Sequence, residues 1–170
     1  MTPELLRFAD DGSIPNNPRL PALLYRGALP PGDPAAAEAC FARHGWPPAW
    51  RNGIYRHHHY HPHAHEALAI AQGRVQVQLG GAEGQVLDLV AGDVVVLPAG
   101  TGHCNLGASP DLLVVGAYPP GSDLAEFTGS AEEYAEALAA IPMVPDPETD
   151  PVTGDPWPSE PPPSVGGFAA

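Results

Sequence analysis

Six of the eight histidines lie between His57 and His65, and a seventh, His103, follows in the motif Pro98-Ala-Gly-Thr-Gly-His103. Side chains of an extended strand alternate between its two faces, so His57, His59 and His61 would share one face. Imidazoles two residues apart, the carboxylate of Glu66 and one distant imidazole form a donor set that suits a divalent transition metal. The spacing therefore predicts a metal site with mixed nitrogen and oxygen ligands.

Two other interpretations of the histidine run have to be weighed. An expression tag is disfavoured, because the run lies deep in the chain and is interrupted by Tyr60, Pro62 and Ala64. A solvated, histidine-rich loop that picks up metal incidentally fits His63 and His65 better than it fits His59 and His61.

Composition narrows the class of protein. The 170 residues, 44% of them hydrophobic, suffice for one domain with a sizeable core. A net charge of −13 argues against nucleic acid and against anionic membrane surfaces as partners. The N-terminus resembles no signal peptide and no apolar run could span a bilayer, so we expect a soluble, cytoplasmic protein. The two cysteines, Cys40 and Cys104, permit a disulfide but do not require one.

Turn and cap signals divide the chain. We expect an N-terminal arm and helix over 1–52, a barrel core over 53–120, a helix within 121–141 and an extended, proline-rich tail over 142–170. The first helix should cover 35–43 after the cap at Asp33, and Ser130 to Glu133 is a capping box that begins the second. Short segments between Gly and Pro turns predict an antiparallel sandwich or barrel. The expected strands are 54–61, 66–72, 74–79, 85–90, 94–97, 103–106 and 111–118.

Two spaced motifs carry a resemblance. The first runs from Gly53 through His59, His61 and Glu66 to Gly73, and the second is Gly92-(five residues)-Pro98-Ala-Gly100-(two)-His103. Together they resemble the paired motifs of the cupin superfamily. The residues at 58–66 and 103–107 are similar to those of one subgroup, the bacterial YjlB-type cupins. No activity is attached to this subgroup as a class. The resemblance implies an all-β, double-stranded β-helix, the cupin jelly-roll barrel, in which His59, His61, Glu66 and His103 bind the metal. One departure is Gly107, where the second motif usually has Asn.

Several residues keep alternative roles. His65 is adjacent to Glu66 and could bind the metal in its place. His57 fits a place at the rim or beside the ligands better than ligation. Asn105, two residues after His103, could substitute for the missing Asn or support a ligand. Mn, Fe, Ni, Co and Zn all suit these donors, so the metal's identity stays open.

The sequence also leads to expectations about the activity of the protein and its oligomeric state. We expect a metal-dependent dioxygenase or isomerase/lyase acting on a small molecule, or else a non-enzymatic cupin that binds or senses a small ligand. A purely structural zinc site is disfavoured, since such sites usually contain Cys. We also expect a homodimer, because the apolar side chains of Ala67, Ala69 and Ala71 and the arm at 23–25 should need a covering partner.

Overall fold

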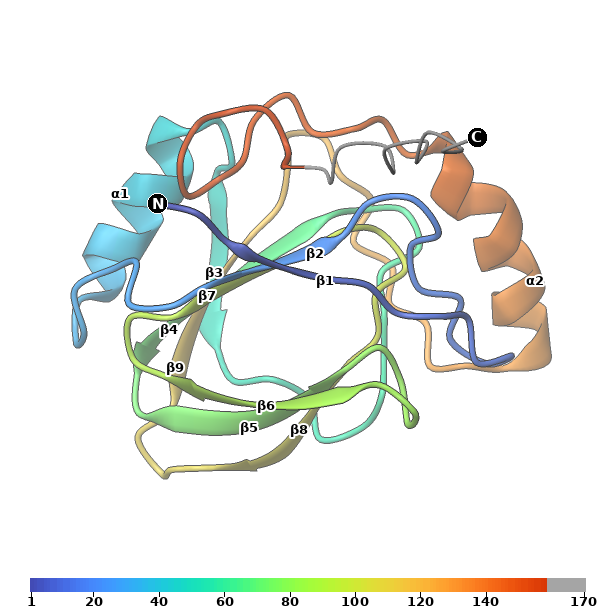
Figure 1. Ribbon diagram of the computed structural model, residues 1–170, viewed down its shortest axis with the longest axis horizontal. Coiled ribbons are helices and arrows are strands. Elements are labelled where there is room, and N and C mark those ends of the chain that lie inside the picture. Colours follow the sequence, from blue (N-terminus) through green and yellow to red (C-terminus); the bar gives the residue numbers. More distant parts are fainter. Residues whose placement is uncertain (159–170) are drawn as a thin grey trace, which may run out of the picture.

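Two antiparallel sheets form the body of the protein in the computed structural model, which describes residues 1–158 (Figure 1). This confirms the expected all-β architecture with two flanking helices. The larger sheet has the order β1 (Glu4–Leu6), β2 (Ala22–Tyr25), β7 (Val94–Leu97), β4 (Glu66–Gln72), β9 (Leu113–Ala117) and β3 (Pro48–Asn52). The smaller sheet has the order β6 (Gln85–Val90), β5 (Arg74–Leu79) and β8 (His103–Ala108).

The inner core lies between the two sheets. Leu68 and Ile70 of β4 point inward because alternate residues of a strand share one face, and they meet Val75 and Val77 of β5. Val95 of β7 points inward as well, whereas Val94 and Val96 face the opposite side of the larger sheet. Val94 and Val96 are fully buried there, in a second core cluster.

The outer face of the larger sheet is covered by the chain itself. Ala67, Ala69 and Ala71 pack into a second cluster with Phe41 of helix α1 (Pro34–Arg43) and with Trp46. The small alanine side chains let the helix approach the sheet closely. The reason given for expecting a dimer, a bare alanine face, is therefore wrong, and the homodimer itself stays a prediction.

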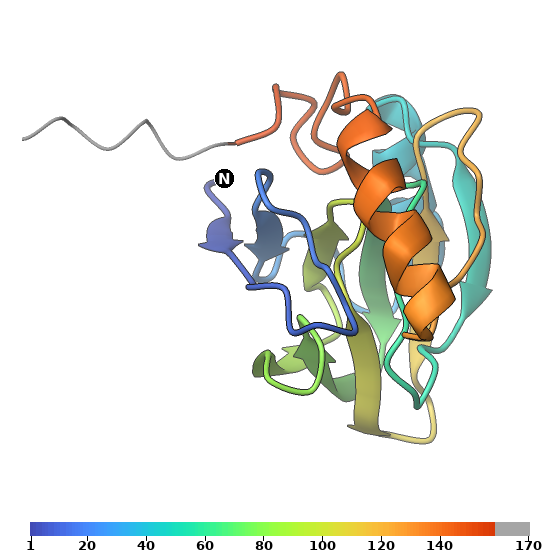
Figure 2. The same cartoon turned by 90° about the vertical axis from the view of Figure 1, so that its right-hand side faces the viewer.

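Both helices begin where their caps predict. Asp33 accepts a hydrogen bond from the backbone N–H of Ala36 at the start of α1. Ser130 and Glu133 form a reciprocal capping box at the start of helix α2 (Ala131–Ala140), which is followed by the 3₁₀ turn η1 (Ile141–Met143). Figure 2 shows α2 lying along one side of the sheets. None of the described helices is long and apolar enough to cross a membrane.

The expected strand over 54–61 is wrong. Within the described chain this segment makes isolated bridges, His59 with His103 and Tyr60 with Phe127, and no continuous ladder. The ring of His59 forms a hydrogen bond with the carbonyl of His57, two residues earlier. Conversely, residues 48–52, which are not among the expected strands, form β3. Pro48 is tolerated there because β3 is an edge strand.

The described part of the C-terminal segment, residues 142–158, runs from α2 across to α1 (Figure 1). This part of the expected extended tail packs on the body of the protein, where Val152 and Trp157 contact the second core cluster. Trp157 stacks on Trp46 with ring centroids 6.4 Å apart and donates to the carbonyl of Pro21. Asp150 is fully buried and accepts a hydrogen bond from Tyr25. The rest of the expected tail, 159–170, lies outside the described residues.

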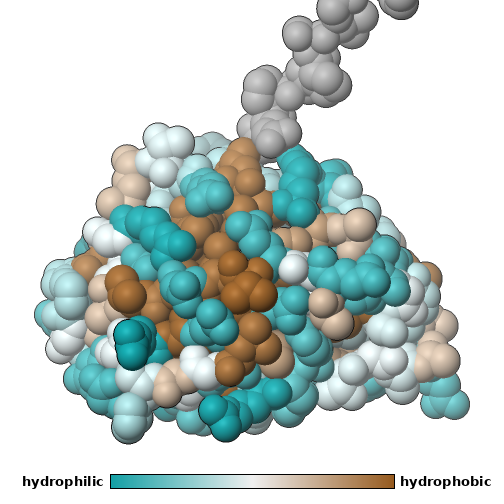
Figure 3. Space-filling view, turned by 60° about the horizontal axis from the view of Figure 1, so that its bottom comes forward, coloured by the Kyte–Doolittle hydropathy of each residue, from teal (hydrophilic) through white to brown (hydrophobic). Residues whose placement is uncertain are grey.

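The outer face of the smaller sheet carries exposed apolar side chains. Val86, Val90 and Leu106 are among the large hydrophobic residues exposed in the described chain. Figure 3, turned toward this side, shows apolar side chains gathered among hydrophilic ones. Gln76 and Gln78 belong to the solvent-facing rows of this sheet and bond to surface groups. Cys40 and Cys104 are both free and buried, so the two thiols do not pair.

The stacking of Trp157 predicts a measurable contribution to stability. Trp157→Ala removes the ring that covers Trp46, and we expect the free energy of unfolding to fall by about 2 kcal/mol. Urea denaturation of the full chain measures it. Leu138→Ala, on the exposed side of α2, is the control and should change stability by less than about 0.5 kcal/mol. Equal effects of the two substitutions would contradict the packing role of the C-terminal segment.

Candidate metal centre

Three side chains from three parts of the chain converge between the sheets. One donor atom each from His61, Glu66 and His103 lie within 4.8 Å of one another. The residues are 4%, 3% and 3% exposed, so water is largely excluded from the donor atoms. Nε2 of His103 is 3.0 Å from Oε1 of Glu66, and Nε2 of His61 is 3.3 Å from Oε2.

Local structure explains the convergence. Glu66 is the first residue of β4, paired with Leu97 of β7, and its side chain shares the inward face with Leu68. His103 opens β8 and pairs through its backbone with His59. Between them the turn at Gly100, with φ of 92°, donates a hydrogen bond to the carbonyl of His61. A side chain at position 100 would collide with the carbonyl of Asn16 and with Ile141, so glycine is required there.

Backbone carbonyls orient the imidazoles. Nδ1 of His59, His61 and His103 lies 2.9, 3.2 and 3.1 Å from the carbonyls of residues 57, 125 and 101 respectively. A carbonyl can only accept, so a neutral imidazole in this position carries its proton on Nδ1. In His61 and His103, Nε2 then carries the lone pair and faces Glu66.

One oxygen of the Glu66 carboxylate accepts a hydrogen bond, and the other has no hydrogen-bond donor. Tyr118 donates to Oε2 at 2.6 Å, and Trp50 donates through Nε1 to the Tyr118 hydroxyl at 2.9 Å. Oε1, although it lies close to His103, is buried without a hydrogen-bond partner. Trp50 fits against β9 because residue 116 is glycine, where a Cβ would lie 2.2 Å from the indole ring.

Burial and charge act against each other at these groups. Burial raises the pKa of Glu66, but hydrogen bonds and charges of His103 and His61 outweigh it and hold the pKa well below its usual range. Burial lowers the pKa of His61, but the contact with Glu66 more than compensates and the net shift is upward. Burial and the neighbouring His103 lower the pKa of His59 to about 3. Burial, then the charge of Glu66, raises the pKa of Tyr118, which therefore stays a hydrogen-bond donor.

His59 lies beside the three-residue cluster rather than within it. Its ring centroid is 4.0 Å from that of His103 and 6.3 Å from that of His61, and it lines the same cavity. It is not among the described side chains whose donor atoms all lie within 4.8 Å of one another. The structure thus brings together three of the four expected ligands, with the fourth adjacent, and ligation by all four stays a prediction.

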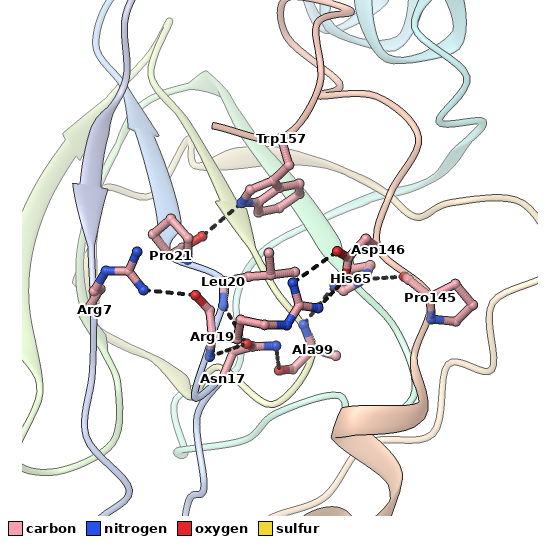
Figure 4. A network of polar contacts seen from close by, with 10 residues as sticks. All are labelled: Arg7, Asn17, Arg19, Leu20, Pro21, His65, Ala99, Pro145, Asp146 and Trp157. Carbon is pink, nitrogen blue, oxygen red and sulfur yellow. Dashed lines mark hydrogen bonds and ion pairs between the residues drawn. The ribbon is translucent and has the colours of Figure 1, made fainter. Parts of the chain in front are cut away.

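The alternative residues lie elsewhere. Both ring nitrogens of His65 are engaged, Nδ1 by the N–H of Ala99 and Nε2 by the carbonyl of Pro145, each at 2.9 Å (Figure 4). His57 is exposed and stacks on Tyr55, and its carbonyl anchors His59. The side chain of Asn105 binds the carbonyl of Ile54 and the N–H of residue 107, which supports the strand beside His103.

A cavity of about 310 Å³ opens beside the cluster. Its floor contains the histidines and Glu66, while Trp50 and Tyr118 form part of the wall. Glu126 also lines it, and its charge contributes to the raised pKa values of His61 and Tyr118. Trp50, Tyr118 and Glu126 were not anticipated from the sequence as functional residues. Their aromatic or acidic character was visible, but the strand pairings that bring them to the cavity were not.

Comparison with known proteins agrees with this geometry. The family model of the cupin domain matches residues 51–114. The uncharacterised protein YjlB of Bacillus subtilis is 41% identical over 147 residues, which cover 86% of this chain and 88% of that protein.

Similar solved structures are more distant. A protein with a double-stranded β-helix domain from Klebsiella pneumoniae is 14% identical, with a TM-score of 0.39 over 75% of this chain and 80% of that one. Oxalate decarboxylase of Lactobacillus farciminis, in a formate complex, is 16% identical, with a TM-score of 0.35 over 83% of this chain and 35% of that one. Such low scores add no weight. On the strength of the matching domain model and the Bacillus relative, the chain belongs to the cupin superfamily.

Proposed function

We propose that this cupin binds one divalent transition metal through His59, His61, Glu66 and His103 and acts on a small molecule in the adjoining cavity. The observation that carries the proposal is the pairing of two acceptors. Nε2 of His103 and Oε1 of Glu66 lie 3.0 Å apart, and Oε1 has no hydrogen-bond partner. When His103 is neutral with its proton on Nδ1, these are two buried acceptors that face each other, and a cation between them, either a proton or a metal ion, stabilises the pair.

The donor set fits a metal of this kind. Three imidazoles and a carboxylate suit Mn, Fe, Ni, Co or Zn, and none of the described cysteines joins the cluster. When bound, such an ion supplies Lewis acidity and coordination positions open to a small molecule. This chemistry is compatible with a dioxygenase or an isomerase/lyase.

The chain's own residues prepare the site. Carbonyls fix the imidazoles in the tautomer that directs Nε2 inward, and Tyr118 with Trp50 holds one carboxylate oxygen so that the other is free. Leu68 and the other apolar side chains beneath the cluster keep water away from the donor atoms. The site is therefore preorganised before anything binds.

Loss of one donor tests the metal site. His103→Ala should weaken metal binding by more than about 100-fold, because losing even an outer partner of a ligand costs roughly 10–100-fold. His58→Ala, outside the cluster, is the matched control and should bind like the wild type. The measurements are calorimetric titration with Mn²⁺ and elemental analysis of untagged protein. Unchanged binding in His103→Ala would refute the site.

The same pair of variants tests activity. A metabolite mixture is incubated with metal-loaded wild type, His58→Ala and His103→Ala, and the products are followed by mass spectrometry. We expect turnover by the wild type and by His58→Ala, and none by His103→Ala. Equal turnover by all three would show that the chemistry does not occur at this site, and no turnover by any would favour the non-enzymatic, ligand-binding cupin.

Removal of the Tyr118 hydroxyl tests the positioning of Glu66. In Tyr118→Phe the carboxylate loses the hydroxyl that donates to Oε2 and gains rotational freedom, so metal affinity should fall by about tenfold. Tyr134→Phe removes a comparable hydroxyl, one that binds the exposed Asp10, and should leave metal affinity unchanged. Equal affinities of the two variants would contradict the positioning role.

Buried His59 predicts a pH dependence of stability in the metal-free protein. Its pKa is about 3 when folded, against 6.5 unfolded, so between these values only the unfolded chain takes up the proton. Stability should therefore fall as the pH is lowered from about 6.5 toward 3, and His59→Gln should reduce this slope. Urea denaturation at pH 7.5, 6 and 5 measures it. A wild-type slope preserved in the variant would contradict the assignment.

A further inference from the structure

Among the described residues that line the cavity beside the proposed metal centre there is no arginine, and its basic side chains are the histidines of the centre itself. The chain has no lysine at all. The two arginines that flank the lining residues 52–55 in the sequence do not enter the cavity. Arg51 pairs with Glu38, and Arg56 is exposed and does not line the cavity. Away from the histidines, a ligand with a free carboxylate would thus find no lysine or arginine as a counterion on these walls.

The opposite charge is present. Glu126 is exposed and lines the cavity, so it stands at the mouth, and its charge is felt by both His61 and Tyr118. Among the described residues its carboxylate takes part in no hydrogen bond or ion pair, so it is available to a cation that enters.

Aromatic rings complete this environment. Trp50, Tyr55 and Tyr118 all line the cavity, and Tyr55 is half exposed near the mouth. The face of an aromatic ring attracts a cation, and rings combined with a carboxylate are a recurring means of binding ammonium groups. Leu124, 44% exposed, adds an apolar contact at the same opening.

We infer that this cavity selects small ligands that carry a positively charged amine, held between Glu126 and the aromatic wall, over ligands that carry a free carboxylate in its place. The inference rests on the proposed function only in taking this cavity as the ligand site. Glu126 is then the residue that determines charge specificity. With a volume of about 310 Å³, the cavity suits a ligand of one ring and a short substituent.

Three probes of one shape test the charge preference. Benzylamine, benzyl alcohol and benzoate are titrated at pH 7.5 into the full chain, first metal-free and then loaded with Zn²⁺, and binding is followed by calorimetry and ligand-observed NMR. Metal-free wild type should bind benzylamine at least about tenfold more tightly than benzoate, with benzyl alcohol between them. Glu126→Gln should reduce the ratio at least about threefold.

The control is Glu83→Gln, which removes the same charge at an exposed turn outside the cavity and should preserve the wild-type ratio. The inference is overturned if benzylamine fails to bind metal-free wild type below about 10 mM, if benzoate binds as tightly, or if Glu126→Gln keeps the ratio. A separate titration with Mn²⁺ reports on the proposed function. Amine preference without metal binding would reject the metal site alone, and metal binding without amine preference would reject this inference alone.

Discussion

A buried carboxylate with an unsatisfied oxygen is the constraint on which the site depends. Burying the charge of Glu66 is costly unless opposite charges or donors surround it. Tyr118 satisfies one oxygen, and the imidazoles of His61 and His103 face the carboxylate from two directions. The same arrangement leaves room for a cation between acceptors, so the stability of the fold and the chemistry of the site involve the same few atoms.

Strand β4 connects this site to the rest of the molecule. Its inward face carries Glu66 above Leu68 and Ile70, while its outward alanines receive α1. It is hydrogen-bonded to β7 on one side and β9 on the other. A shift of one residue in its register would exchange the two faces, placing the carboxylate under the helix and an alanine in the cavity. The covering of the alanine face by α1 therefore also secures the orientation of Glu66.

Much of this could be predicted from local sequence. Alternation of apolar and polar residues, together with glycine turns, predicted the bounds of β4 to β7 correctly. The capping residues predicted where both helices begin. The spacing of histidines placed His61, Glu66 and His103 together. The strand predicted over 54–61 is wrong, since only isolated bridges of His59 and Tyr60 occur where a continuous ladder was expected.

Other parts of the site depend on long-range register. Trp50 reaches Tyr118 because it pairs with Gly116, and Tyr118 reaches Glu66 because Ala117 pairs with Ala67. Neither pairing leaves a local signal. For the same reason the role of His65 could not be settled from its position beside Glu66, since its partners, Ala99 and Pro145, are distant in the chain.

The contacts of the C-terminal segment also have a consequence for synthesis. Arg19 pairs with Asp146, Trp157 binds the carbonyl of Pro21, and Pro145 holds the ring that precedes Glu66 (Figure 4). Contacts between the two ends of a chain form only after nearly all of it has left the ribosome, and such high contact order slows folding. During translation the sheets can assemble while the ring of His65 still lacks its partner at Pro145. The hydrogen bond that holds the ring next to Glu66 therefore forms late in synthesis, after the strands that carry the cluster of His61, Glu66 and His103.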